Sequence, residues 1–247
     1  MLKSAGTGGT GGGAGVISVN GASGVVTVPV AGRLTSFQIL TGAGTYTPGA
    51  GVTSIIVVPI GAGASGGGAN AVAGTYGHGG GSGAWCMKRY ASLAASYAFS
   101  CGAGGVASNG NGTNGAATTF DTLTAPGGIA ANSGVTAVTI TTASAFPGIT
   151  YPAGGAVATG GDTNSAGNPA TIALRGTTAT TGISGAGGST PWGAGGSPLV
   201  ATAAAALAGN PGTGIGSGGG GCIATDSASS VLGGAGANGG VLVWEYS

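Results

Sequence analysis

The sequence predicts a mainly β protein with little or no α-helix, in which a sandwich-like frame of β-strands carries a packed sheaf of glycine-rich polyproline II helices. Three observations lead to this fold class. Glycine makes up 61 of the 247 residues, and several glycine runs keep a period of three residues. Between these runs lie short segments rich in β-branched and aromatic residues, which are typical of strands. Charged residues are only 4% of the chain and the net charge is +1, unlike the composition of disordered proteins.

The strand segments begin with VISVNGASGVVTVPV at residues 16–30, where two β-branched runs flank a turn built from Asn20, Gly21 and Gly24. This pattern predicts a hairpin. Further strands are expected at 37–40 and 54–60 with Pro48-Gly49 as the turn between them, at 85–90 and 97–101 as a second pair, around Phe120, at 135–146 and at 241–247. We assign five aromatic residues to the core of this frame: Trp85, Phe99, Phe120, Trp244 and Tyr246.

The glycine runs are clearest in GTYGHGGGSGAW, residues 74–85, where Gly74, Gly77, Gly80 and Gly83 fall on every third position. The same phase occurs at 6–15, 182–188, 209–221 and 233–239. A polyproline II helix has three residues per turn and no internal hydrogen bonds, so its backbone groups need partners elsewhere. A face made only of glycine lets two helices approach and bond laterally. An interior helix needs several such faces, which explains GGGS at 79–82 and GGGGC at 218–222.

The runs are short and the ten prolines are scattered, so the chain does not match collagen, which needs a long unbroken Gly-X-Y repeat. We therefore expect the glycine helices to pack within one chain. Only VATAAAALAG, residues 200–209, has a helical composition. It is short and has no cap, so at most a turn or two of helix is expected there.

Several function classes lack their sequence signals. The five cations are spread along the chain, so no nucleic-acid surface is expected. No apolar run reaches the ~20 residues of a membrane span, so we expect no membrane insertion. The start of the chain lacks the apolar core of a secretory signal, and synthesis in the cytoplasm without a signal peptide is expected. The three cysteines, Cys86, Cys101 and Cys222, match no metal spacing; buried thiols are favoured and a Cys86–Cys101 bridge stays open.

The residues that could perform catalysis are few: one histidine, His78, and four acids, Asp121, Asp162, Asp226 and Glu245. No G-x-S-x-G elbow accompanies them, and no acid pair can be recognised as a glycosidase dyad. The segment GTGGTGGGAG at 6–15 has no strand before it, as a nucleotide-binding loop would require. We expect a protein that is not an enzyme and that has no cofactor and no metal.

Four segments resemble the glycine-rich domain of bacteriophage tail-fibre and tail-tip receptor-binding proteins, the polyglycine II type adhesins. They are SFQILTGAGTYTPGAGVTSIIVVPIGAGASGGG at 36–68, GSGAWCMKRY at 81–90 with SYAFSCGAGG at 96–105, GGAGANGGVLVWEYS at 233–247, and VISVNGASGVVTV at 16–28. The resemblance implies β-strands with a polyglycine II sheaf, host specificity in the loops that join the helices, and a homotrimer. The chain departs from the family in its many alanine and threonine residues and in a long insertion at 135–181.

This resemblance implies a virion protein of the phage tail. Residues 1–32 would be an attachment arm that binds other tail or baseplate proteins. Residues 33–247 would be a receptor-binding domain for a host surface glycan or outer-membrane protein. Two alternatives stay open: a purely structural baseplate or decoration protein without receptor binding, and an ice-binding protein, because a small antifreeze class also contains such sheaves.

Candidate receptor contacts are side chains on loops without apolar periodicity, where rings can stack on sugars or anchor a partner. They are Tyr76, His78, Tyr151, Asp162, Asn164 and Trp192. His78 occupies an X position of a glycine triplet, so we expect it to point outward. Asp162 and Asn164 are expected as polar contacts on a tip loop. For each aromatic residue, packing against the sheaf is the alternative.

Overall fold

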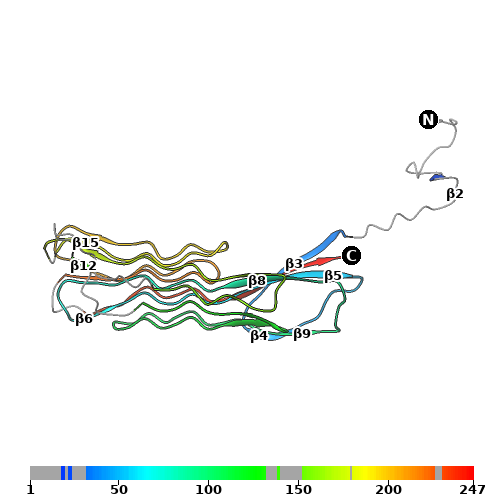
Figure 1. The fold of residues 1–247 in the computed structure, drawn as a ribbon, viewed down its shortest axis with the longest axis horizontal. Coiled ribbons are helices and arrows are strands. Elements are labelled where there is room, and N and C mark those ends of the chain that lie inside the picture. Colours follow the sequence, from blue (N-terminus) through cyan, green and yellow to red (C-terminus); the bar gives the residue numbers. More distant parts are fainter. Residues whose placement is uncertain are drawn as a thin grey trace, which may run out of the picture.

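The structure of the protein is a computed structural model that describes residues 32–131, 152–178, 180–225 and 230–247, together with the backbones of β1 (Ser18–Val19), β2 (Ala22–Ser23) and β12 (Val138–Thr139). All regular secondary structure in these ranges is β-strand. No described helix is therefore long and apolar enough to cross a membrane. The body is elongated, with broad strands at one end and long segments that lie side by side and run to the other end (Figure 1). The predicted mainly β fold is confirmed.

The broad end is a frame of two antiparallel sheets. The five-stranded sheet has the order β13-β8-β5-β20-β3, with bounds Thr163–Ser165, Trp85–Tyr90, Ser54–Ile60, Gly240–Tyr246 and Leu34–Leu40. The four-stranded sheet has the order β11-β10-β9-β4, with bounds Leu123–Ala125, Thr118–Phe120, Tyr97–Ser100 and Ala43–Tyr46.

The main apolar core lies between these two sheets. Alternate residues of the five-stranded sheet, such as Ile55, Val57 and Val243, pack against Phe120 and Tyr97 of the four-stranded sheet. The ring centroids of Phe120 and Tyr97 are 5.3 Å apart in a stacked arrangement. Period-two alternation in strands produces this separation of inward and outward side chains, so the frame is a sandwich, as expected.

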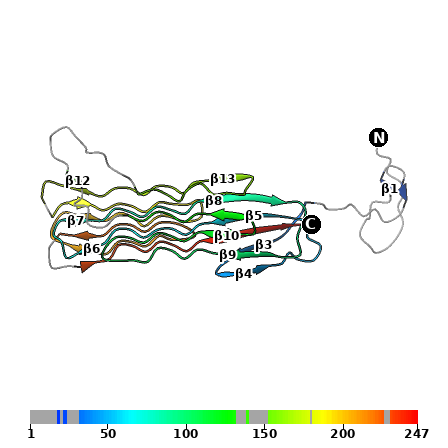
Figure 2. The same ribbon diagram turned by 60° about the horizontal axis from the view of Figure 1, so that its bottom comes forward.

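The beginning and the end of the described body meet at the outer edge of the frame. The Gly32 N–H donates to the carbonyl of Ser247 at 2.5 Å, and the Ser247 N–H donates to the carbonyl of Arg33 at 3.0 Å. The chain between them runs repeatedly away from the frame and back, and it reverses at both ends of the body (Figure 2).

The sheaf that extends from the frame is organised around residues 61–68. Gly61, Ala64 and Gly67 donate their N–H groups to the carbonyls of one neighbouring segment, those of Ala84, Gly81 and His78, at 2.8–2.9 Å. The next residues in each triplet donate to two other segments: Ala62, Ser65 and Gly68 to 116, 113 and 110, and Gly63 and Gly66 to 237 and 234. Three successive residues thus bond in three directions, as a helix with three residues per turn requires.

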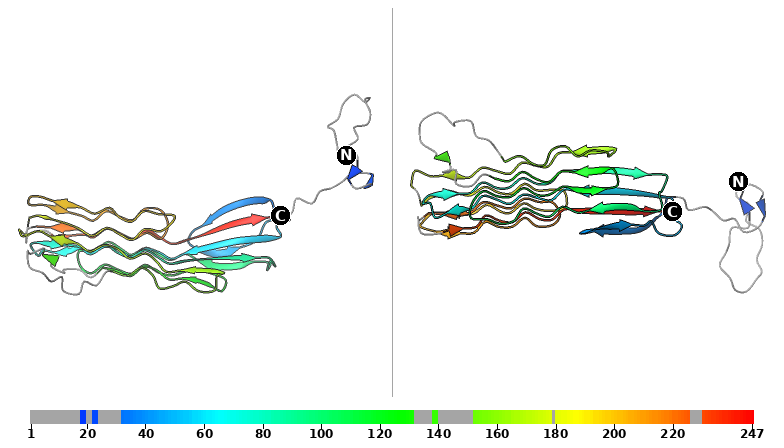
Figure 3. Two further views of the ribbon diagram at one scale, coloured as in Figure 1. Left: turned by 45° about the horizontal axis from the view of Figure 1, so that its top comes forward. Right: turned by 90° about the horizontal axis from the view of Figure 1, so that it is seen from below.

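Two more segments are interior helices of the same kind, residues 77–84 and 216–222. In the first, Gly77, Gly80 and Gly83 donate to the carbonyls of Cys222, Gly219 and Gly216 at 2.8–2.9 Å. All residues of 61–69, 74–84 and 216–225 are buried. The runs GGGS and GGGGC lie in these interior helices, so the prediction made from them is confirmed. Figure 3 shows the layers of helices side by side.

The phased glycines of an outer helix supply one bonding face, as expected. Gly233, Gly236 and Gly239 donate to the carbonyls at 108, 105 and 102 at 2.9 Å. A Cβ atom on Gly233 or Gly236 would overlap the backbone of residues 61–68. Glycine is therefore required here because two backbones lie in contact, and each buried N–H group gains an acceptor.

Strands of the frame continue directly into sheaf helices, which sets the helix register. Ile60 of β5 pairs with Trp85 of β8, and the next bond along the chain joins the Gly61 N–H to the Ala84 carbonyl at 2.8 Å. The strand pairing and the helix pairing thus form one continuous antiparallel ladder.

Three small sheets of short strands close the far end of the sheaf. They are β6 (Ala69–Asn70) with β19 (Ser230–Val231); β7 (Thr75–Tyr76) with β18 (Ile223–Ala224) and β17 (Ala206–Leu207); and β12 with β14 (Leu174–Arg175), β15 (Gly182–Ile183) and β16 (Val200–Ala201).

Some local predictions were wrong. The strands β8 and β9 are not paired with each other, because β8 joins the five-stranded sheet and β9 pairs with β4 and β10 in the other sheet. Strand β4 was missed. Residues 200–209 form no helix, which agrees with the expectation of at most a turn or two; they contain the strands β16 and β17, joined by a bend at 202–204. The expectation of thiols is confirmed, because all three cysteines are free and both Cys86 and Cys222 are buried. Most of 135–146 lies outside the described residues, and residues 20, 21 and 24 of the predicted hairpin turn also lie outside them, although β1 pairs with β2.

The sheaf predicts a sharp difference between two glycine substitutions. Gly80→Ala places a Cβ atom against the carbonyls of Ala64 and Ser65 in the central helix, and we expect it to lower the free energy of unfolding by about 2–3 kcal/mol or more. Gly110→Ala is the matched control, because its Cβ meets no atom within 4 Å, and a change within about 0.5 kcal/mol is expected. Denaturant unfolding measures both; equal effects would contradict the sheaf.

Candidate functional site: the distal tip of the sheaf

The distal tip is defined here as the end of the sheaf opposite Gly32 and Ser247. The described chain reverses there at 71–74, at 176–178 with 180–181, and at 202–205, next to the short strands that close the sheaf. Both the interior helices and the frame strands behind them are held by continuous backbone hydrogen bonds. The tip therefore presents loops on a rigid support, which is the usual position of binding residues.

Tyr76 is the largest buried side chain of the tip, with an exposed fraction of 0%. It packs in a cluster with Ala173, Ala201 and Ile223. Its Cε1 and Cζ atoms lie 2.7 and 2.9 Å from the position of a Cβ atom on Gly182, so the ring covers that glycine. Burial raises the pKa of Tyr76, while the positive charge of Arg175 acts in the opposite direction. The prediction of Tyr76 as an exposed contact is wrong, because neighbouring segments surround it.

His78 was also expected to point outward, and this is wrong. Its exposed fraction is 7%, and its Nδ1 atom accepts a hydrogen bond of 2.7 Å from the Ala173 N–H. Burial lowers the pKa of His78 below its usual 6.5. Other segments surround the helix 77–84 and bury all of its residues, so its X positions do not face solvent. The neutral imidazole therefore serves as an acceptor inside the sheaf.

Trp192 lies near the frame rather than at the tip, and it is half-buried. The rings of Trp192 and Trp85 are nearly perpendicular, and their centroids are 5.5 Å apart. Both rings adjoin the small cluster of Val58, Ile60 and Leu242 on the outer side of the five-stranded sheet. Trp192 thus packs where strands change into glycine helices, while Tyr151 lies outside the described residues.

Asp162 and Asn164 are exposed, but they lie at the frame and not on a tip loop, which corrects the expectation. The Arg89 N–H donates to Oδ2 of Asp162 at 2.9 Å. The Gly161 N–H donates to Oδ1 of Asn164 at 3.1 Å, and the amide Nδ2 of Asn164 donates back to the Gly161 carbonyl at 3.0 Å. These bonds fix the turn into β13 beside β8.

Side chains that the sequence did not single out form the described surface of the tip. Val72, Val200 and Leu207 are exposed aliphatic residues of its turns and short strands. Arg175 of β14 is half-buried, and exposed Thr177 and Thr178 follow it. The only sequence signal for this group was the isolation of Arg175, since no Lys or Arg follows it and the preceding one is Arg89.

The outer face of the five-stranded sheet is a second exposed feature. Phe37, Ile39 and Met87 are exposed apolar residues on this face, beside half-buried Trp244. The rings of Phe37 and Trp244 have centroids 5.1 Å apart. On the opposite face Glu245 is buried, and its Oε1 accepts from the Tyr46 hydroxyl at 2.6 Å and the Gly49 N–H at 3.0 Å, which fixes the turn between β4 and β5.

A family model described as the glycine-rich domain matches residues 38–246. The chain belongs to the glycine-rich domain family. No curated protein sequence gives a significant match. The matched range begins in β3 and ends in β20, so this glycine-rich domain includes both the frame and the sheaf. In the described ranges, no three His, Cys, Asp or Glu side chains gather closely enough to hold a metal ion.

The burial of His78 predicts a pH dependence of stability. The pKa is lowered in the folded state, so below about pH 6.5 the unfolded chain binds a proton that the folded chain does not. Stability should therefore fall as the pH decreases from 7.5 to 5, by at most about 1.4 kcal/mol per pH unit for one proton.

The control is His78→Gln, which removes the only histidine of the chain. Its free energy of unfolding should change less with pH over the same interval. Urea unfolding at several pH values measures both slopes. The same slope in wild type and variant would mean that His78 is not buried as a neutral acceptor.

Proposed function

We propose that this glycine-rich domain is the host-binding part of a bacteriophage tail fibre or tail tip, acting as an adhesin without catalytic activity. The observation that carries the proposal is the division of the molecule into two ends. The two ends of the described body are hydrogen-bonded together at the frame, and the sheaf extends from there to the distal tip, where the chain reverses again (Figure 1). Attachment at the frame would hold the tip away from the particle.

The chemistry of the tip suits recognition of a surface. The side chains that the structure describes on its surface are exposed aliphatic groups, threonines and one arginine. Such contacts fit a host surface glycan or an outer-membrane protein as the partner. Residues 1–32 would join the domain to other tail or baseplate proteins, which would place the protein in the virion tail.

We further propose that the protein acts as a homotrimer. The exposed apolar face around Phe37, Ile39 and Met87 supports burial between subunits, because contiguous apolar patches commonly mark interaction sites. Three tips on one fibre would multiply weak contacts into avidity. Light scattering of the purified chain should give three chain masses per particle, and a monomer would contradict this part of the proposal.

The test of host binding uses two matched triple variants of the full chain. One replaces the tip residues Val72, Val200 and Leu207 by serine, and the other replaces Val106, Ile129 and Val157, which are exposed aliphatic residues of sheaf helices. Fluorescently labelled proteins are incubated with a panel of bacterial strains and bound protein is measured by flow cytometry. We expect wild type to label some strains, the tip variant to lose about tenfold or more of this binding, and the control variant to keep it.

Equal binding by the two variants, or no labelling of any strain by wild type, would contradict the proposal. The second result would favour the structural alternative, a baseplate or decoration protein that binds no receptor.

A further inference from the structure

We propose that Arg175, together with Thr178 and Thr181 of the hairpin that follows it, is a binding site for an anionic group on the distal tip, with a saccharide that carries carboxylate or phosphate as its ligand. The inference rests on the proposed function, because it names the chemistry of the receptor that the tip would bind. It is carried by the position of Arg175 at the tip, by its Nε atom, which has no acceptor in the described ranges, and by the hydroxyl groups of the hairpin that follows it.

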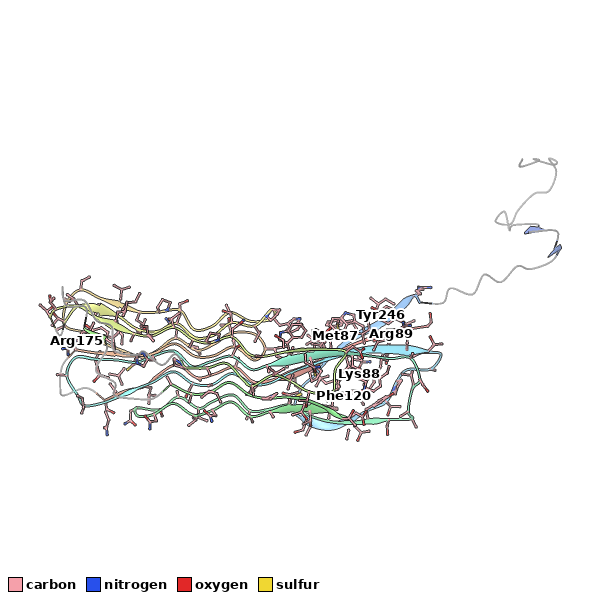
Figure 4. The ribbon with its side chains drawn as sticks, viewed as in Figure 1. Met87, Lys88, Arg89, Phe120, Arg175 and Tyr246 are labelled. Carbon is pink, nitrogen blue, oxygen red and sulfur yellow. The ribbon has the colours of Figure 1, made fainter. Side chains whose placement is uncertain are left out.

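Arg175 is the only cation of the described tip. It belongs to β14 and lies opposite Gly182 of β15 in an antiparallel pair. Figure 4 places Arg175 at the end of the sheaf, far from Lys88 and Arg89 at the frame. Arg33 lies next to Gly32 at the frame, so within the described ranges the positive charge at this end comes from Arg175 alone.

No described acid neutralises this guanidinium. Asp121 accepts a hydrogen bond from the Tyr90 hydroxyl, Asp162 accepts from the Arg89 N–H, and Glu245 accepts from Tyr46 and Gly49. These three acids belong to the frame. Within the described ranges, Nε of Arg175 is shielded from solvent and has no hydrogen-bond acceptor. Buried charged groups are normally paired, so within the described ranges the guanidinium carries a positive charge that an anionic ligand would neutralise.

A buried tyrosine packs against the strand pair that carries Arg175. Tyr76 is fully buried, and its phenol end lies over Gly182, across the strand pair from Arg175. Any side chain at position 182 would displace this ring. This packing fixes the backbone from which the Arg175 side chain extends.

The hairpin beside Arg175 supplies hydroxyl groups. The Gly176 N–H donates to the Thr181 carbonyl at 2.7 Å, and the Thr178 and Thr181 hydroxyl oxygens are 2.9 Å apart. A hydroxyl group can both donate and accept hydrogen bonds, which matches the hydroxyls of a sugar. A guanidinium binds carboxylate or phosphate through two parallel N–H donors. Together they fit a saccharide with one anionic group.

The test measures binding of the purified full chain to three immobilised polymers: polygalacturonate with carboxylates, phosphorylated mannan with phosphates, and neutral dextran. Biolayer interferometry compares wild type, Arg175→Gln, Arg175→Lys and the matched control Arg89→Gln, which removes one exposed cation at the frame. Wild type should prefer at least one anionic polymer to dextran, and salt should weaken this binding. Arg175→Gln should lose about tenfold or more, Arg175→Lys should lose part of the affinity, and Arg89→Gln should stay within about twofold of wild type.

Unchanged binding of both Arg175 variants, or equal binding of wild type to dextran and the anionic polymers, overturns the inference. If Arg175→Gln does not fold, Arg175→Lys decides the result. Neither of these results contradicts the proposed binding of the tip to host cells. That proposal is tested separately, on whole bacteria and with serine variants of the aliphatic residues.

Discussion

Lateral hydrogen bonding between glycine-lined backbones is the interaction on which the rest of this structure depends. In 61–68, 77–84 and 216–222 the chain is buried without a conventional apolar core, and its N–H groups donate to carbonyls of surrounding helices. Glycine loses much conformational freedom on folding, so these bonds and the close packing of backbones must offset that cost. The apolar core is concentrated in the frame, where the two sheets meet.

The frame and the sheaf support each other through register. Strand β5 continues into 61–68, 77–84 continues into β8, and 233–239 continues into β20. A shift of one residue in the sandwich would move the glycine faces out of contact, because helix and strand share one ladder. The sandwich thus fixes which backbones meet, and the sheaf carries that order to the distal tip.

The sequence was sufficient to predict most of the long frame strands, the sandwich and the sheaf, because these depend on periods of two and three residues, but it missed β4 and the wrong partner was expected for β8. It also identified GGGS and GGGGC as interior runs. It was insufficient for Tyr76 and His78, since whether an X position is buried depends on the helices that return to it from 173, 182 and 223. Asp162 and Asn164 were placed at the wrong end, because the point where a chain reverses is set by long-range pairing. Arg175 shows no local pattern at all.

The most direct measurement of the central account is amide hydrogen exchange along the folded chain. If the interior helices are held by lateral hydrogen bonds, amides of 61–68, 77–84 and 216–222 should exchange as slowly as those of β5 and β20, through global unfolding. If the amides of these glycine segments exchange as fast as those of an unstructured chain while the amides of the frame stay protected, the account is contradicted.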